Sequence, residues 1–348
     1  MTGYFNRVKS LTPTTLWVNN VTLEQARLGQ AAGAVGATQN PAHLSKVLTS
    51  EDGQWLMPMM DEILQEGLND TDTVAELQRR AVARICNEFL GLYQRTGGRQ
   101  GFVSIQADPF HEDAANIIDN AEKSLALADN FIIKIPVTED GLVAIGELAR
   151  RGIPLLATEV MSMDQVRDVI DEYEAATSNL KNPAPLIIAH INGIFDEYMA
   201  ETAKAQGISV QPDALAQAAL MLGRKINEYI RNADNPHVFY MAGGARGLHH
   251  FTHWVGARGA VTINWKGTAD KLVEQDPQVL DVFNAPSPSG YVDELISKLE
   301  DYAHAWTPGS LARKDYEHFG PVVKFRRQFE DGWTDALKAV QARRQGKK

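Results

Sequence analysis

The sequence contains a single cysteine, Cys86, among its 348 residues. One thiol cannot form an internal disulfide, and it cannot supply a zinc site built from several cysteines. Uncharged apolar runs stay well short of the roughly 20 residues that a membrane-spanning helix needs. Residues 1–15 also lack the apolar stretch of a signal peptide. These absences predict a cytoplasmic protein that does not enter a membrane.

Positive charge is also scarce, because 34 lysines and arginines stand against 44 aspartates and glutamates, for a net charge of −10. Proteins that bind nucleic acid usually carry a basic face, so we expect no nucleic-acid partner. Apolar residues make up 44% of the chain, which is ample material for a large core. The composition therefore predicts an ordinary folded protein rather than a disordered chain.

Eight short apolar segments have the character of buried strands. They are continuous rather than alternating, which is typical of parallel strands that are covered on both faces. The segments are Thr15–Asn19, Ala34–Thr38, Gly101–Asp108, Asn130–Pro136, Ile153–Thr158, Leu186–Ile191, His237–Ala242 and Ala260–Asn264. Amphipathic helical stretches lie between them, and extra helices are expected over Glu51–Thr96 and Ile194–Arg231.

Strands that alternate with helices predict an α/β fold, and eight such units predict a closed (β/α)8 TIM barrel. Such a barrel takes roughly 250 residues. We therefore expect one domain over 1–348, with inserted helices, the barrel at 14–270 and a helical C-terminal extension at 271–348. An open dinucleotide-binding sheet is the alternative. It is disfavoured because Asn19–Thr22 follows the first strand where a glycine-rich turn would be required.

Lys134 is the most informative residue at the carboxyl ends of these strands, where barrel enzymes carry their chemistry. It lies inside the apolar segment Phe131–Pro136. Burial lowers the pKa of an ammonium group toward values at which the neutral amine attacks a carbonyl carbon. A lysine paired with a carboxylate for stability would produce the same pattern. Burial alone therefore leaves both roles open.

The region around Lys134 strongly resembles the transaldolase family, including its fructose-6-phosphate aldolase branch. The resemblance is carried by Lys134–Thr138, by the helix that follows, and by a fifth strand that ends in Thr158. Three further segments match other strands of the family, namely Ala37–Pro41, Val103–Asp108 and Met241–Arg246. The resemblance covers all eight strands and is most specific around Lys134.

This resemblance implies a class I transaldolase or aldolase, a transferase or lyase of carbohydrate metabolism and the pentose phosphate pathway, with no metal and no other cofactor. Lys134 would form a Schiff base with a ketose donor, and a dihydroxyacetone-type three-carbon unit would be cleaved off or transferred. By the same resemblance, Thr158 would hold the catalytic water and Gln106 would occupy the acid/base position. Asn40 would bind hydroxyl groups of the donor.

Several positions depart from the family pattern. Asn19 stands where relatives carry an aspartate, and an amide cannot act as a base. Ile194 replaces the arginine that grips the substrate phosphate, and Ile191 replaces the acid/base tyrosine of the aldolase branch. We therefore expect a non-standard sugar substrate. It either lacks the usual phosphate or binds it through Arg246 and the backbone at Gly244.

The proton-transfer group would then be Glu159, Asp108 or His190. Glu159 directly follows Thr158, yet neighbouring residues of a strand point to opposite faces, which argues against Glu159. His190 has a suitable ordinary pKa, but a hydrogen-bonded core histidine is an equal explanation.

The expected catalytic residues are Lys134, Gln106, Thr158 and Asn19. The expected substrate-binding residues are Asn40, Thr38, Arg246, Gly244, His190 and Asn192. His249 and His253 are spaced by one helical turn, but no carboxylate lies in the turn between them, so we expect no metal site. The histidines are better explained as lining the rim after the seventh strand. Trp265 and Lys266 follow the eighth strand, where they would either face the site or have a packing role only.

Two functions remain open at this point. The first is a transaldolase-like enzyme that acts on a sugar or sugar phosphate. The second is a catalytically reduced relative that binds sugar phosphates or serves a regulatory role. A lyase or isomerase without a Schiff base is a more distant alternative, because a fold does not fix its chemistry. The identity of the sugars and the formation of a homodimer are also left open.

Overall fold

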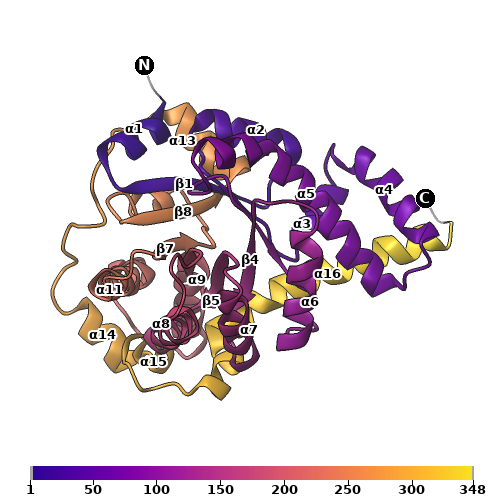
Figure 1. Cartoon of the computed structure of the whole chain (residues 1–348). Helices are drawn as coiled ribbons and strands as arrows, with labels where there is room; N and C mark the ends of the chain where they lie inside the picture. The colour runs from indigo at the N-terminus through magenta and orange to yellow at the C-terminus, as the bar shows by residue number, and fades with distance from the viewer. Residues whose placement is uncertain (1–2, 347–348) are drawn as a thin grey trace.

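The computed structural model describes residues 3–346, and its centre is a closed barrel of eight parallel strands in sequence order (Figure 1). The strands are β1 (Thr14–Asn19), β2 (Ala37–Thr38), β3 (Val103–Gln106), β4 (Phe131–Pro136), β5 (Leu155–Val160), β6 (Leu186–Ile191), β7 (Val238–Gly243) and β8 (Gly259–Asn264). Pairing of β1 with β8 closes the barrel. This architecture confirms the predicted (β/α)8 fold.

Helices surround the barrel and fill the two long gaps between strands. Those before the eighth strand are α1 (Tyr4–Leu11), α2 (Leu23–Ala32), α3 (His43–Leu48), α4 (Gly53–Gln65), α5 (Asp70–Arg95), α6 (Ala114–Leu125), α7 (Glu139–Arg150), α8 (Met163–Thr177), α9 (Asn192–Ala205), α10 (Pro212–Leu215), α11 (Ala218–Asn232) and α12 (His249–Thr252). The predicted C-terminal helices are η1 (Trp265–Ala269), α13 (Asp270–Gln275), α14 (Tyr291–Lys298), α15 (Glu300–Trp306), η2 (Arg313–His318) and α16 (Gly320–Arg344).

Helix α7, which follows the strand of Lys134, begins where its local sequence predicts. The Thr138 hydroxyl accepts a hydrogen bond from the Gly141 amide, and this cap satisfies one of the free donors at the start of the helix. Glu139 and Asp140 place negative charge at the positive end of the helix dipole. These contacts fix the chain immediately after β4.

Most strand boundaries differ by one or two residues from the predicted ones, and the second and fifth strands differ in ways that bear on the site. Only Ala37–Thr38 of the predicted second strand forms a strand, whereas β5 continues past Thr158 to Val160. The pairing of β5 with β6 shifts register between Ala157 and Val160, which marks a β-bulge. A bulge inserts an extra residue into the strand, so the alternation of inward and outward side chains is interrupted at this point.

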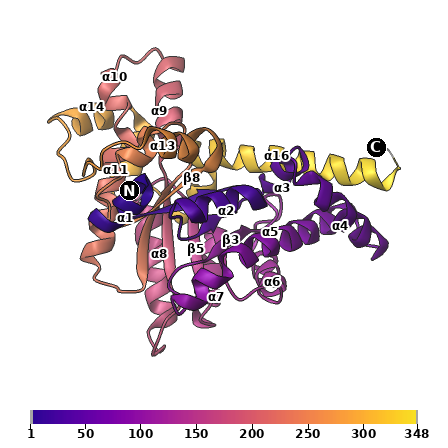
Figure 2. The same ribbon diagram turned by 90° about the horizontal axis from the view of Figure 1, so that it is seen from above.

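The barrel strands and the helices around them share one large apolar core, and the end of α16 belongs to a second, smaller core. The second core joins α3, α4 and the first half of α5 to Trp333, Ala336 and Val340 of α16. We call these parts of α3, α4, α5 and α16 the helical layer. Figure 2 shows α16 running from the barrel toward α4. No helix within residues 3–346 is long and apolar enough to cross a membrane.

Candidate active site

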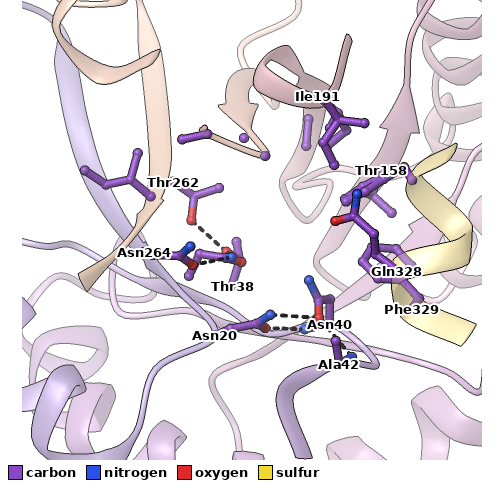
Figure 3. Close-up of a pocket in the computed structure, with 18 of the residues that line it drawn as sticks. Asn20, Thr38, Asn40, Ala42, Thr158, Ile191, Thr262, Asn264, Gln328 and Phe329 are labelled. Carbon is purple, nitrogen blue, oxygen red and sulfur yellow. Dashed lines mark hydrogen bonds between the residues drawn. The ribbon is translucent and has the colours of Figure 1, made fainter. Parts of the chain in front are cut away.

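A cavity of about 460 Å³ lies at the carboxyl-terminal end of the barrel (Figure 3). Its lining includes residues of β1, β2, β4, β5, β6, β7 and β8, together with Phe325, Gln328 and Phe329 of α16. Small-molecule sites usually fall between about 300 and 1,000 Å³, so this cavity has the size of a binding site for a single metabolite.

Lys134 reaches this cavity from the middle of β4, and its side chain is nearly buried, with 6% of the residue exposed. Within the described residues it makes no hydrogen bond or ion pair, and its Nζ lies 5.3 Å from the centre of the Phe329 ring. Burial lowers the pKa of Lys134 to about 8, although the carboxyl groups of Glu159 and Glu112 oppose the shift. A substantial neutral fraction is therefore available at mildly basic pH.

A polar cluster beside Lys134 consists of the buried Gln106 and Glu159 and the partly buried Glu112 and Arg326. Gln106 pairs with Lys134 in the register of β3 and β4. Its Nε2 donates to Glu159 Oε1 at 3.2 Å and to Glu112 Oε1 at 3.4 Å. Arg326 Nε lies 3.4 Å from Glu112 Oε2 and 3.8 Å from Glu159 Oε2. We call these four residues the carboxylate cluster.

Glu159 joins this cluster because the bulge in β5 changes its direction. Its φ is +61°, a left-handed conformation that is unusual for a residue with a side chain. The preceding Thr158 lines the cavity, while the Glu159 carboxylate turns toward Gln106. Glu159 itself does not line the cavity, and it is linked to Lys134 through Gln106 and through its charge.

Burial also changes the acid–base behaviour of the two carboxyl groups. It raises the pKa of Glu159, although the positive charges of Arg326 and Lys134 and the hydrogen bond from Gln106 act in the opposite direction. The pKa of Glu112 is raised well above its ordinary value by burial and by the neighbouring Glu159. The pair therefore holds a proton at higher pH than exposed glutamates do, and it lies close enough to Lys134 to affect the Lys134 pKa.

Amide and hydroxyl groups cover the opposite wall of the cavity. Asn19 Nδ2 donates to Asn264 Oδ1 at 3.0 Å, and Asn19 Oδ1 accepts from the Thr38 hydroxyl at 3.0 Å. The Thr38 and Thr262 hydroxyl oxygens lie 2.6 Å apart. These bonds link β1, β2 and β8 and fix the direction of the Asn19 amide (Figure 3).

A second amide pair lies beside this wall, in the loops after β1 and β2. Asn20 Nδ2 donates to Asn40 Oδ1 at 2.9 Å, and Asn20 Oδ1 accepts from the backbone amide of Asn40 at 3.0 Å. Asn40 Oδ1 also accepts from the Ala42 amide. The Asn40 Nδ2 group therefore stays available to donate to a hydroxyl group in the cavity.

The comparison with known proteins agrees with this geometry. A profile of the Transaldolase/Fructose-6-phosphate aldolase family matches residues 16–296, which is most of the chain. The chain belongs to the transaldolase/fructose-6-phosphate aldolase family. A protein named Transaldolase 1 from Streptomyces coelicolor is 26% identical over 293 residues, covering 81% of this chain and 72% of that protein. A transaldolase from Frankia alni is 29% identical over 167 residues, covering 45% of this chain and 44% of that protein.

Most residues that the transaldolase resemblance selected meet at the cavity. The lining includes Lys134, Thr158, Asn19, Thr38, Asn40, Gly244 and Arg246. Gln106 does not line the cavity; it lies beside Lys134 in the register of β3 and β4 and donates to Glu112 and Glu159.

His190 and Asn192 lie outside the cavity lining and belong to the buried core. The ring nitrogens of His190 face the backbone oxygens of Val160 at 3.2 Å and Ala219 at 3.3 Å. Burial lowers the His190 pKa to about 4. The Asn192 amide donates to the His250 backbone oxygen, and its Oδ1 accepts from the Gly193 amide. Their side chains are therefore engaged by the backbone, and the expected contacts with substrate have no support here.

The other polar groups considered from the sequence also lie away from the cavity. The Asp108 carboxylate lies 3.0 Å from His111 Nδ1, next to the loop that follows β3. The rings of His249, His250 and His253 pack against one another, and His250 Nε2 lies 3.3 Å from Asp196 Oδ2. Among residues 3–346, no group of three His, Cys, Asp or Glu side chains is placed to hold a metal ion.

Four cations within residues 3–346 line the cavity, and of these only Lys46 was not among the candidates named from the sequence. Arg246 lines the cavity, but its Nε is paired with Glu197 at 3.1 Å and its Nη2 donates to Gln328. Lys46 and Lys266 line the same cavity. The position of Lys266 just past the eighth strand indicated that it could face the site. Lys46 lies on a short helix, and nothing in the sequence around it indicated a place at the cavity. Among the described residues, no acidic side chain lines the cavity.

Proposed function

We propose that this chain is a transaldolase-like class I enzyme in which Lys134 forms a Schiff base with a ketose donor. The observation that carries the proposal is a buried lysine without an ion-pair partner in the described residues, with its pKa lowered to about 8, at the cavity of a transaldolase-family barrel. An amine in this state attacks a carbonyl carbon without prior activation by a base.

In the proposed reaction, the Lys134 nitrogen attacks the ketose C2, and loss of water gives a protonated imine. The C4 hydroxyl then loses its proton, the C3–C4 bond breaks, and its electron pair moves toward the imine to leave an enamine. An aldehyde departs. The enamine either attacks an acceptor aldehyde or takes up a proton, and hydrolysis of the imine frees Lys134. The electron sink is the imine itself, so the scheme requires no cofactor.

The carboxylate cluster supports the proton transfers in this scheme. We assign the role of proton acceptor and donor to Glu159, which acts through a water molecule. The electrostatic coupling between Glu159 and Lys134 supports the assignment, and so does the raised pKa of Glu159. Thr158 Oγ1 is buried and has no hydrogen-bond partner in the described residues, which suits it to hold that water.

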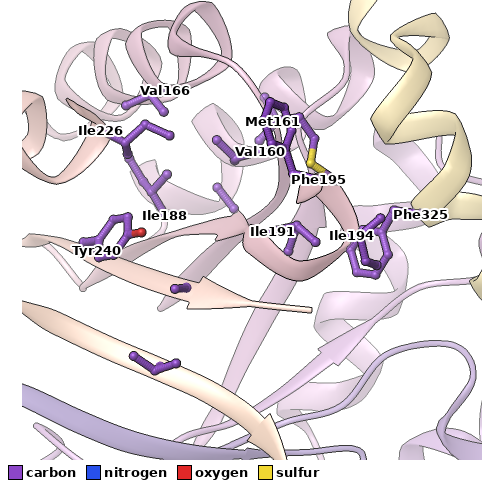
Figure 4. Close-up of a cluster of buried hydrophobic side chains, with 14 of the residues drawn as sticks. Val160, Met161, Val166, Ile188, Ile191, Ile194, Phe195, Ile226, Tyr240 and Phe325 are labelled. Carbon is purple, nitrogen blue, oxygen red and sulfur yellow. The ribbon is translucent and has the colours of Figure 1, made fainter. Parts of the chain in front are cut away.

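The apolar residues at the end of β6 support a non-standard substrate. Ile191 and Ile194 line the cavity and pack near Phe325 of α16 (Figure 4). This part of the wall offers no hydrogen-bond donor from its side chains to a phosphoryl group. Arg246 is the nearby cation, and Glu197 already pairs with it.

Trapping with borohydride tests the proposal directly. Incubation with ketose donors and borohydride should add a stable mass to the peptide that contains Lys134, as measured by peptide mass spectrometry. Lys134→Ala should abolish the adduct, whereas Lys204→Ala on α9 is the matched control and should leave it unchanged. If no ketose, phosphorylated or not, gives an adduct with the wild-type chain, the enzyme proposal fails. Sugar-phosphate binding without an adduct would then favour the reduced, regulatory relative.

A further inference from the structure

Two lysines occupy the rim of the cavity on the side of β1, β2 and β8. Lys46 lies on α3, six residues after Asn40, and Lys266 follows the end of β8 at Asn264. Both residues line the cavity. They come from segments more than 200 positions apart in the chain, so their meeting is a product of barrel closure through the β1–β8 pair.

Neither lysine is neutralised by the protein. Within residues 3–346, no hydrogen bond or ion pair joins either ammonium group to another residue, and no acidic side chain lines the cavity around them. Lys46 is half-buried, and its pKa is lowered by burial and by the positive charge of Lys266. Two like charges that repel each other at a cavity wall are stabilised when an anion binds between them.

Arg246 does not share this position. It follows β7, and its guanidinium is engaged by Glu197 and Gln328. The amides of Asn19, Asn20 and Asn40 lie on the side of the two lysines. These side chains are neutral, so no carboxylate at this wall repels an incoming anion.

We propose that Lys46 and Lys266 form an anion-binding subsite that holds a phosphoryl or carboxylate group of the substrate. The subsite is separate from the Arg246 position. It deepens the proposed function by naming the substrate class: an anionic sugar derivative whose charged group lies at the β1–β2–β8 rim. The claim that the bound anion belongs to a substrate rests on the proposed function. Anion binding by the two lysines does not depend on catalysis.

Binding of inorganic phosphate tests the subsite without any turnover. Titration calorimetry should detect phosphate binding to the wild-type chain, and Lys46→Gln with Lys266→Gln should weaken it by roughly tenfold or more. The control Lys204→Gln removes an exposed lysine on α9 and should bind phosphate as the wild type does. Absence of phosphate binding in the wild type overturns the proposal. So does binding that survives the double substitution.

A matched set of three compounds then separates the two sources of negative charge and the two cationic positions. The half-saturating concentration for borohydride trapping should be compared for a ketose, its phosphate ester and a related keto acid. The double lysine substitution should raise this concentration roughly tenfold for one or both anionic compounds and less than about twofold for the neutral ketose. The phosphate ester and the keto acid show which group the subsite prefers.

The substitution Arg246→Gln tests whether Arg246, rather than the two lysines, binds the anionic group. If this substitution abolishes the preference for anionic compounds and the double lysine substitution does not, the subsite assignment is overturned while the Schiff base stands. If no compound is trapped at Lys134 but phosphate binding still requires the two lysines, the proposed function fails while the anion subsite stands.

Discussion

Lys134 is a buried cation that has no hydrogen-bond or ion-pair partner in the described residues. Thr38, Asn19 and Gln106 each have hydrogen-bond partners within reach, whereas the Lys134 ammonium faces only the cavity and the Phe329 ring. A shift of the Lys134 pKa from 10.5 to about 8 corresponds to roughly 3 kcal/mol of disfavoured charge. Costs of this kind are typical of functional sites, which is in line with the proposed role of Lys134.

The same shift predicts a pH dependence of stability. The unfolded chain keeps the proton on Lys134 up to its ordinary pKa of 10.5, whereas the folded chain releases it near 8. Between these values the unfolded state binds more protons, so the Lys134 contribution to stability rises with pH and reaches its full value above 10.5. Below about 8 the penalty of the buried charge is constant.

Adduct formation at Lys134 should also depend on pH. The trapping rate at Lys134 should rise with pH through a midpoint of about 8, because only the neutral amine attacks the ketose. Glu159→Gln removes a negative charge that raises the Lys134 pKa, so its midpoint should shift to lower pH. Trapping rates measured between pH 6 and 10 by mass spectrometry give both midpoints.

The control for that experiment is Glu139→Gln at the exposed start of α7. It should leave the midpoint unchanged. Glu159→Gln should also reduce turnover by roughly 10²- to 10⁴-fold, because the proposed proton acceptor is lost while the nucleophile is retained. Unchanged turnover would remove Glu159 from the mechanism, and a midpoint that moves to higher pH would contradict the electrostatic coupling.

At the level of elements, the carboxylate cluster joins β3 and the segment after it to the end of β5 and to α16. The bulge at the end of β5 turns Glu159 toward Gln106, and α16 supplies Arg326 between the two carboxyl groups. The Arg326 side chain is 16% exposed, and its Nε lies near both Glu112 and Glu159. Arg326 of α16 therefore lowers the pKa values of two carboxyl groups, Glu112 after β3 and Glu159 on β5.

Arg326→Met tests this contribution of α16. Removal of the cation leaves two buried carboxyl groups facing each other, so the pKa values of Glu112 and Glu159 should rise further. If ionised Glu159 accepts the proton, the acidic limb of the pH–turnover profile should move to higher pH. The neighbouring Arg327 is exposed, and Arg327→Met should leave the profile unchanged. An unchanged acidic limb in Arg326→Met would show that the cluster does not control the proton transfer.

The elements themselves were largely readable from the sequence. The apolar segment around Lys134 and the threonine cap at Thr138 gave β4 and the start of α7, since both depend on residues close in the chain. The direction of Glu159 was not readable, because the period-2 rule holds only for an unbroken strand. The same limit applies to Lys46, which reaches the cavity through contacts that only barrel closure produces.

For the whole molecule, the net charge of −10 and the charge of the cavity have opposite signs. Charges further apart than about 10 Å are largely screened at 0.1 M salt, so a bound molecule is governed by the residues that line the cavity. The overall charge, from which we expect no nucleic-acid partner, therefore does not decide the charge of a small substrate. The sequence could not separate these two cases, because it does not show which charges share a wall.

The helical layer and the barrel are joined by α16, which contributes Phe329 to the cavity and Trp333 to the second core one turn later. Trp333 is 1% exposed and packs with Leu56, Met60 and Leu77. Trp333→Ala should lower the free energy of unfolding by roughly 3–5 kcal/mol, because it removes a large buried side chain. Urea unfolding measures this loss, and Trp333→Phe should retain part of the stability.

The loss should also be uneven across the molecule, because the second core contains only parts of α3, α4, α5 and α16. In Trp333→Ala, hydrogen exchange should accelerate most in α4 and in the first half of α5, while β4 to β7 keep their protection. Trapping at Lys134 should weaken as Phe329 and Gln328 lose their support from the same helix. Equal acceleration in the barrel strands would instead show that the two cores unfold together, so that α16 is an inseparable part of the barrel rather than a link to a second unit.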